Sequence, residues 1–169
     1  MNSILSAWNA LDLDAAVRAL LSCCAARRWA QEVSAHRPYA TAEDLFQAAD
    51  SVWTKMEEQD WLEAFRAHPR IGERMAAHAT AQSAQWSHQE QSAAEVARED
   101  VLAQLADGNL RYEQLFGFTY IVYATGKSGE EMLKVLEQRL AGDRQSELRE
   151  AAEQQRQITQ IRLRKWLAI

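Results

Sequence analysis

The sequence has few residues that break helices or cross-link a fold. Its 169 residues include two prolines and six glycines, and its two cysteines, Cys23 and Cys24, are adjacent. Neighbouring residues of a helix point in different directions, so this pair supports neither a disulfide framework nor a zinc site. We interpret both as small buried hydrophobic residues. Because Ala, Leu, Gln, Glu and Arg are abundant instead, the composition favours helix over nearly the whole chain.

The chain also lacks an excess of positive charge and long apolar runs. Its formal net charge is −5 and its pI is about 5.4. This balance argues against nucleic acid or an anionic membrane surface as the main partner. No apolar run approaches the roughly 18 to 20 residues that span a bilayer, and the N-terminus lacks a signal-peptide pattern. We therefore expect a cytoplasmic protein.

None of the common metal, nucleotide or hydrolase motifs is complete. The four histidines are too few and too irregularly spaced for a recognisable metal site: His36, His68, His78 and His88. No G-x-G-x-x-G or G-x-S-x-G is found, and Gly126-Lys127-Ser128 resembles the end of a P-loop without its upstream glycine. Helix capping by Ser128 explains that stretch better. The sequence therefore predicts neither a metal nor a nucleotide cofactor.

Hydrophobic periodicity predicts one all-α domain over residues 1–169, a bundle of about eight helices without significant β-sheet. Asp12 is expected to cap one helix, and Thr41-x-x-Asp44 and Ser128-x-x-Glu131 resemble capping boxes for two others. Phe118–Tyr123 is the one stretch with strong β-propensity. Since no second such run can pair with it, we interpret it as a buried connection or an irregular helix.

Four further helix boundaries are predicted from local signals. Asp60 is expected to be the N-cap of the helix that precedes the His-Pro pair. Ser87-x-x-Glu90 matches a capping box, which predicts that a long helix begins there. Asp107-Gly108 is expected to end that helix, and Asn109 to cap a further turn or two.

His68 is notable because Pro69 follows it. Proline disfavours the helical conformation for the residue before it, so His68 is expected where the chain leaves a helix and becomes extended. Gly72 would then let the chain bend back. An imidazole held there titrates near neutral pH and can act as a general acid or base. The alternative is an ordinary turn at a helix end.

Two roles are open for Glu90. As the third residue of a capping box, its carboxylate would fold back onto the backbone N–H of Ser87. Alternatively, it faces a pocket with Gln91 beside it, so that a carboxylate and an amide meet a polar ligand.

Arg162 lies near the centre of an apolar stripe on the last predicted helix, residues 143–166. At 100° per residue the stripe contains Leu148, Ala151, Gln155, Ile158, Arg162, Trp166 and Ile169. A buried guanidinium without an anion costs several kcal/mol of desolvation. Arg162 therefore needs either an internal salt bridge to a buried carboxylate or an anionic ligand.

Several motifs of the chain occur together, and in order, in one protein family. They are Cys23-Cys24, Arg28-Trp29, Arg37-Pro38, Ala49-Asp50, Trp53, Asp60-Trp61-Leu62-Glu63-Ala64-Phe65, His68-Pro69-Arg70-Ile71-Gly72, Ser87-x-x-Glu90-Gln91, Asn109-x-x-Tyr112, Phe116-Gly117-Phe118, Gly126-Lys127-Ser128 and Ile161-Arg162-Leu163. Each is weak alone, but the ordered set over nearly the whole chain is specific. With it, the sequence resembles the 2-oxo-4-hydroxy-4-carboxy-5-ureidoimidazoline (OHCU) decarboxylases of urate breakdown.

This resemblance implies an all-helical, cofactor-free carboxy-lyase that converts the small-molecule ureidoimidazoline to (S)-allantoin and carbon dioxide. It implies His68 as the general acid or base and Glu90 as a second catalytic residue. The substrate-contacting residues of the family correspond to Pro69, Ser87, Gln91, Tyr120, Ile121, Val122, Tyr123, Ala124 and Arg162. These assignments predict that His68 and Arg162 face one small cavity. Relatives of this kind also suggest a homodimer.

Two other functions remain open from the sequence. A helical adaptor domain, with tryptophan-rich helices forming a partner groove, would leave Arg162 paired to an internal carboxylate. It would also have no ligand-sized cavity between the Glu90 and Arg162 helices. A lyase or hydrolase that acts on a related ureido acid is the second alternative, and comparison of substrates would distinguish it.

Overall fold

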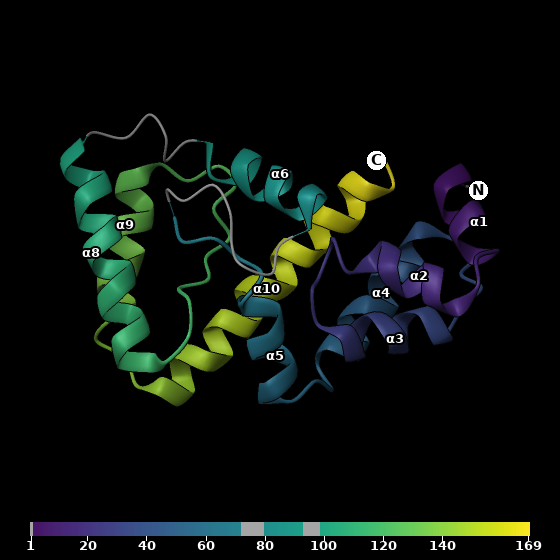
Figure 1. The fold of residues 1–169 in the computed structure, drawn as a ribbon, viewed down its shortest axis with the longest axis horizontal. Helices are drawn as coiled ribbons and strands as arrows, with labels where there is room; N and C mark the ends of the chain where they lie inside the picture. The colour runs from purple at the N-terminus through teal and green to yellow at the C-terminus, as the bar shows by residue number, and fades with distance from the viewer. Residues whose placement is uncertain (1, 72–79, 93–98) are drawn as a thin grey trace. The chain divides into compact units, whose positions relative to one another are not determined.

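A computed structural model describes residues 2–71, 80–92 and 99–169 of the chain (Figure 1). Within these residues it contains nine helices and no β-strand. The predicted all-α fold is therefore confirmed. In the same residues, no helix combines the length and hydrophobicity that a membrane crossing requires. The bend predicted at Gly72 lies outside the described residues.

The helices divide between two compact units. The first, Met1–Ala64 with Arg156–Ile169, contains α1 (Ser3–Asn9), α2 (Leu13–Leu20), α3 (Arg27–Ala35), α4 (Ala42–Trp53), most of α5 (Glu58–Phe65) and the last part of α10 (Arg144–Trp166). The second, Phe65–Gln155, contains α6 (Ala81–Glu90), α8 (Glu99–Phe116), α9 (Gly129–Arg139) and the first part of α10. The single domain expected from the sequence stays a prediction.

Polar side chains begin three of these helices as the sequence predicts. Asp12 accepts a backbone N–H of the first turn of α2 at 2.7 Å. Thr41 and Asp44 form both hydrogen bonds of a capping box at α4, and Ser128 and Glu131 do the same at α9. Each cap satisfies N–H groups that have no partner inside the helix. Short-range hydrogen-bonding rules thus explain where these helices start.

The prediction that Asp60 is the N-cap of α5 is wrong. The helix begins at Glu58, and Asp60 lies in its first turn. Its carboxylate accepts the backbone N–H of Glu57 at 3.0 Å and a guanidinium N–H of Arg28 at 3.2 Å. A carboxylate in the first turn can reach back to the residue before the helix, as in the second half of a capping box. The Asp60 side chain therefore binds the backbone at the start of α5 while Asp60 itself lies in the first turn of the helix.

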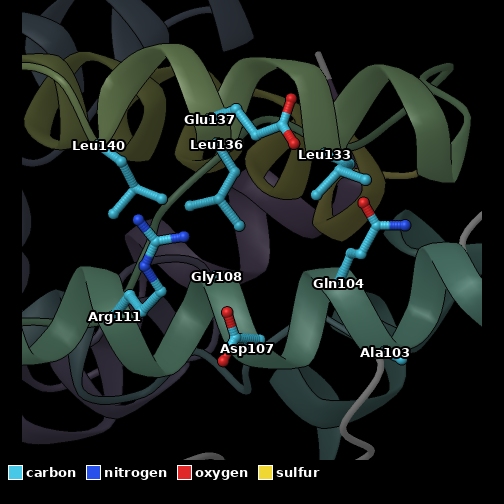
Figure 2. Close-up of a pocket in the computed structure, with 9 residues that line it drawn as sticks. All are labelled: Ala103, Gln104, Asp107, Gly108, Arg111, Leu133, Leu136, Glu137 and Leu140. Carbon is cyan, nitrogen blue, oxygen red and sulfur yellow. The ribbon is translucent and has the colours of Figure 1, made fainter.

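The predicted helix end at Asp107-Gly108 is also wrong, because α8 continues to Phe116. The amide of Asn109 donates to the Leu105 carbonyl at 2.8 Å, one turn earlier, so it does not cap a new helix. At Gly108 an added Cβ would lie only 2.6 Å from Cδ2 of Leu136 in α9. Figure 2 shows the Leu136 side chain pointing from α9 toward α8 at this position. Gly108 thus permits close helix packing and does not end the helix.

Substituting Gly108 with valine tests this packing. Gly108→Val is expected to lower the free energy of unfolding by about 1 to 3 kcal/mol, because Leu136 is fully buried and must move. Urea unfolding of the two proteins measures the difference. Gln114→Val, at an exposed position of the same helix, is the matched control and should change stability by less than about 1 kcal/mol. Equal stability of the two variants would contradict the close contact.

Cys23 and Cys24 are both buried, as the sequence predicts. Burial raises the pKa of both thiols, that of Cys24 to about 11, and the positive charge of Arg162 opposes this by a smaller amount. Burial also raises the pKa of Tyr39 to about 12. In the folded protein these three groups therefore keep their protons well into the alkaline range.

This predicts a specific loss of stability at high pH. Below about pH 9 the Cys24 thiol is protonated in both states, and its contribution is intact. Between pH 9 and 11 the unfolded thiol ionises at its usual pKa of 9.0 while the folded one stays neutral, so the free energy of unfolding falls. The melting temperature from pH 7.5 to 10.5 checks this decline, which should be shallower in Cys24→Ala. An identical pH dependence in that variant would refute the assignment.

In the first unit, the last part of α10 is fixed to α4. Asp50 accepts hydrogen bonds from Arg156 at 2.8 Å and from the amide of Gln160 at 2.7 Å. The same Gln160 amide donates to the Phe46 carbonyl at 3.0 Å. These contacts define the orientation of the helix turn that carries Arg162.

Candidate functional site

His68 follows α5 directly, at the helix exit that the His-Pro pair predicts. Its backbone N–H donates to the Phe65 carbonyl at 3.0 Å, its side chain is half-buried, and Pro69 is buried. Arg70 donates two hydrogen bonds to the Glu113 carboxylate of α8, at 2.8 and 2.7 Å. A paired arginine–carboxylate contact fixes direction as well as distance. The turn that carries His68 is thus anchored on both sides.

The His68 side chain is held by Gln155 of α10. Nε2 of His68 lies 2.7 Å from Oε1 of Gln155, whose side chain is completely buried. Because Oε1 is an acceptor, Nε2 carries the proton in this arrangement. Gln155 belongs to the apolar stripe predicted on the last helix. The signal was present, since a buried amide on an apolar face needs a hydrogen-bond partner just as Arg162 does.

The segment between α8 and α9 also contacts α10. Residues 118–124 are neither helix nor strand and most are buried, as the sequence predicts. The Tyr123 N–H donates to Oε1 of Gln154 at 2.7 Å. Gln154 and Gln155 are consecutive, so α10 contacts both the histidine and this segment. That His68 and Tyr120–Ala124 line one site stays a prediction.

Aromatic packing supports this arrangement. The rings of Phe65, before the histidine turn, and Phe118, at the start of the segment, have centroids 5.6 Å apart. Phe118 also packs edge-on against Tyr112 of α8 at 5.7 Å. Such ring contacts are worth about 0.5 to 1.5 kcal/mol each beyond the buried area.

Glu90 does not cap a helix, so that interpretation of Ser87-x-x-Glu90 is wrong. α6 begins after Thr80, whose hydroxyl accepts the Ser83 N–H at 3.0 Å, and Ser87 and Glu90 lie near the end of the helix. Both are buried, and Gln91, the C-cap, is half-buried. Their spacing of three and four residues places the three side chains on one side of the helix. That Glu90 faces a polar ligand stays a prediction.

Arg162 belongs to the first unit and is 2% exposed. The predicted stripe on α10 is buried from Leu148 to Ile158 and at Arg162, whereas Trp166 is half-buried and Ile169 is 64% exposed. The stripe thus ends before the last residue. That Arg162 and His68 face one cavity stays a prediction.

A pocket of about 340 Å³ lies elsewhere in the second unit, between α8 and α9. Figure 2 shows Leu133 and Leu136 of α9, and Leu140 at its C-cap, facing Asp107 and Arg111 of α8 across it. None of its lining residues is a predicted site residue. This pocket is an alternative position for a ligand, and an experiment can distinguish binding there from binding at the His68 site.

The family that the motifs of the sequence resemble is also the one whose model matches the chain. The model of the OHCU decarboxylase family matches residues 9–164, which is most of the chain. This chain belongs to the OHCU decarboxylase family.

Two curated relatives of this OHCU decarboxylase family member are bifunctional proteins of uric acid degradation. The uric acid degradation bifunctional protein TTL of Arabidopsis thaliana is 35% identical over 144 residues, covering 85% of this chain and 44% of the relative. The uric acid degradation bifunctional protein of Bacillus sp. (strain TB-90) is 24% identical over 136 residues, covering 79% and 26%. The chain therefore spans less than half the length of these relatives.

Two solved structures have the same fold. An OHCU decarboxylase crystallised in the presence of (S)-allantoin has a TM-score of 0.76 and 32% identity, with 88% of this chain and 96% of that chain covered. An (S)-allantoin synthase has a TM-score of 0.71 and 16% identity, covering 96% of this chain and 53% of the other. The first of these matches over nearly its entire length.

Proposed function

We propose that this protein decarboxylates 2-oxo-4-hydroxy-4-carboxy-5-ureidoimidazoline to (S)-allantoin without a cofactor. The observation that supports this most strongly is the pair of hydrogen bonds that α10 makes through Gln154 and Gln155 to Tyr123 and His68. One helix thus contacts both the histidine and a backbone segment whose peptide groups suit a ureido ligand. Membership of the family and the relative crystallised with (S)-allantoin support the substrate class.

The reaction needs positioning more than it needs an external electron sink. Loss of carbon dioxide breaks the bond between the ring carbon and the carboxylate and leaves the electron pair in the ring, where the adjacent C=N group accepts it. The ring hydroxyl then becomes a carbonyl as its proton leaves, and the carbon that bears the ureido group gains a proton on one face. The nitrogen of the former C=N group takes up one further proton, which is the net proton consumed. Orientation of the carboxylate and stabilisation of the ring charge are what the protein adds.

His68 is the residue proposed to move the proton. Since Nε2 donates to Gln155, Nδ1 is the nitrogen that accepts the hydroxyl proton and delivers it to the ring carbon. Gln155 acts through His68 and is a positioning residue. Proton delivery from one fixed nitrogen gives a single enantiomer.

The other predicted site residues are proposed to hold the substrate. Glu90 orients the imidazole and the substrate hydroxyl, and it is the second catalytic residue. Arg162 binds ring carbonyl or ureido oxygens through paired hydrogen bonds, which suit a guanidinium. The remaining contacts are assigned to Pro69, Ser87, Gln91 and the backbone of Tyr120, Ile121, Val122, Tyr123 and Ala124.

Stereospecific product formation tests the proposed function. The unstable intermediate is generated from urate with the two upstream enzymes, and circular dichroism follows chiral allantoin after this protein is added. We expect rapid (S)-allantoin formation, slowed in Arg162→Met and less so in Arg162→Lys. Slow, racemic product at the uncatalysed rate would contradict the proposal and favour the adaptor. Faster turnover of a related ureido acid would favour the third hypothesis.

The proposal also includes a homodimer and a cytoplasmic location. Sedimentation equilibrium measures the mass of the protein in solution, and cell fractionation locates it. A monomer, or recovery with membranes, would contradict these two expectations without affecting the chemistry.

A further inference from the structure

A buried ion pair contacts the backbone segment between α8 and α9. Arg139 of α9 and Glu147 of α10 are 8% and 5% exposed, and Nε of Arg139 donates to the Glu147 carboxylate at 2.8 Å. The Tyr112 hydroxyl donates to the same carboxylate oxygen at 2.8 Å and accepts from Nη2 of Arg139 at 3.0 Å. The remaining Arg139 nitrogen, Nη1, donates to the Ile121 carbonyl at 2.6 Å. One guanidinium thus joins the segment to three helices.

A contribution to folding stability does not by itself explain why the chain buries this ion pair. The desolvation of two buried charges offsets most of their attraction, and apolar replacements of similar size are often equally stable. What the guanidinium adds is direction, because its planar donors are fixed relative to one another. Burial raises the pKa of Tyr112, so its hydroxyl keeps the proton that it donates to Glu147. Arg139, Glu147 and Tyr112 together therefore hold the Nη1–H of Arg139 at the Ile121 carbonyl.

Three main-chain groups on either side of Val122 are held by side chains. The carbonyl of Ile121 and the N–H and carbonyl of Tyr123 have protein partners, namely Arg139, Gln154 and Lys127. Val122 lies between these two anchored residues.

Val122 is only 6% exposed. Across the described parts of the chain, neither its N–H nor its C=O has a hydrogen-bond partner. A buried peptide group normally has one, because leaving it without a partner is unfavourable. A donor and an acceptor side by side are complementary to a ureide, in which an N–H is bonded to a C=O.

We propose that Arg139 and Gln154 are positioning residues that hold Ile121 and Tyr123 so that the Val122 N–H and C=O bind the ureidoimidazoline. This inference rests on the proposed function, and it adds residues that act through the backbone and do not touch the substrate. Glu147 and Tyr112 fix Arg139. Loss of either positioning residue therefore weakens substrate binding more than the chemical step.

Gln154 offers a matched pair of variants. Gln154→Met removes the acceptor for the Tyr123 N–H, whereas Gln154→Glu keeps one. We expect Gln154→Met to raise KM about tenfold and to change kcat less than threefold, because binding is lost equally in the ground and transition states. Gln154→Glu should keep KM within about threefold of the parent. Thermal unfolding of both variants reports any general destabilisation.

Arg139 is tested by the double variant Arg139→Met/Glu147→Met, which replaces the whole ion pair by apolar side chains. We expect a folded protein with a melting temperature close to that of the parent and a KM about tenfold higher. If this variant does not fold, the two Gln154 variants decide the matter.

The outcomes separate this inference from the proposed function. No (S)-allantoin formation by the parent protein would overturn both. Parental KM and kcat in Gln154→Met and in the folded double variant would overturn only the positioning role. Equal KM increases in Gln154→Met and Gln154→Glu would do the same, because they would show a general structural effect.

Discussion

Replacing His68 with alanine is expected to lower kcat by a factor of about 10² to 10⁴, the usual contribution of a general acid–base group. The fold should persist, because the side chain is half-buried and the turn is closed by the backbone bond from His68 to Phe65. The initial rate of (S)-allantoin formation, followed by circular dichroism, measures the effect. Far-ultraviolet dichroism of the same samples measures helix content.

His88 provides the control for this experiment. It lies on α6, two residues before Glu90, and is exposed. His88→Ala should form (S)-allantoin at the parental rate, which would show that loss of an imidazole as such does not slow the reaction. Parental turnover in His68→Ala would remove this residue from the mechanism.

The largest effect on stability is expected for Glu147→Ala. This change leaves the Arg139 guanidinium buried without its counterion and the Tyr112 hydroxyl without its acceptor. Breaking a buried ion pair from one side typically costs about 3 to 5 kcal/mol. Urea unfolding should therefore show a large decrease in the midpoint, which the double apolar replacement largely restores.

An exposed ion pair of the same chain gives the comparison. Glu32 accepts from Arg28 at 3.1 Å on α3, and both side chains are more than one third exposed. Glu32→Ala should cost no more than about 0.5 kcal/mol. If Glu147→Ala cost as little as Glu32→Ala, the buried group would not hold the segment as described.

Sequence rules located the features that depend on neighbouring residues. The caps at Asp12, Thr41 and Ser128 and the helix exit at His68 each follow from a few adjacent side chains. Gly108 shows where such rules fail, because its role depends on Leu136, which lies on a different helix. A glycine that ends a helix and a glycine that admits a neighbouring side chain look alike in sequence.

The candidate site residues also divide into those that a local sequence pattern indicates and those that depend on a distant contact. His68 was found from the proline that follows it, and Arg162 from its place on an apolar stripe. Gln155 lies on the same stripe, but its partner is 87 residues away in sequence, so no local pattern predicts the contact. Likewise, the sequence gives no local sign that the Ile121 carbonyl needs Arg139 as a donor. Contacts between distant elements are what the structure adds.

Nuclear magnetic resonance of the ¹⁵N-labelled protein with (S)-allantoin tests most directly where the ligand binds. Binding at the His68 site predicts that the largest chemical-shift changes occur at the Val122 amide and its neighbours and at the His68 ring nitrogens. Changes confined to the α8–α9 pocket, at Gln104, Asp107 and Arg111, would contradict this account. So would the absence of any change at saturating (S)-allantoin.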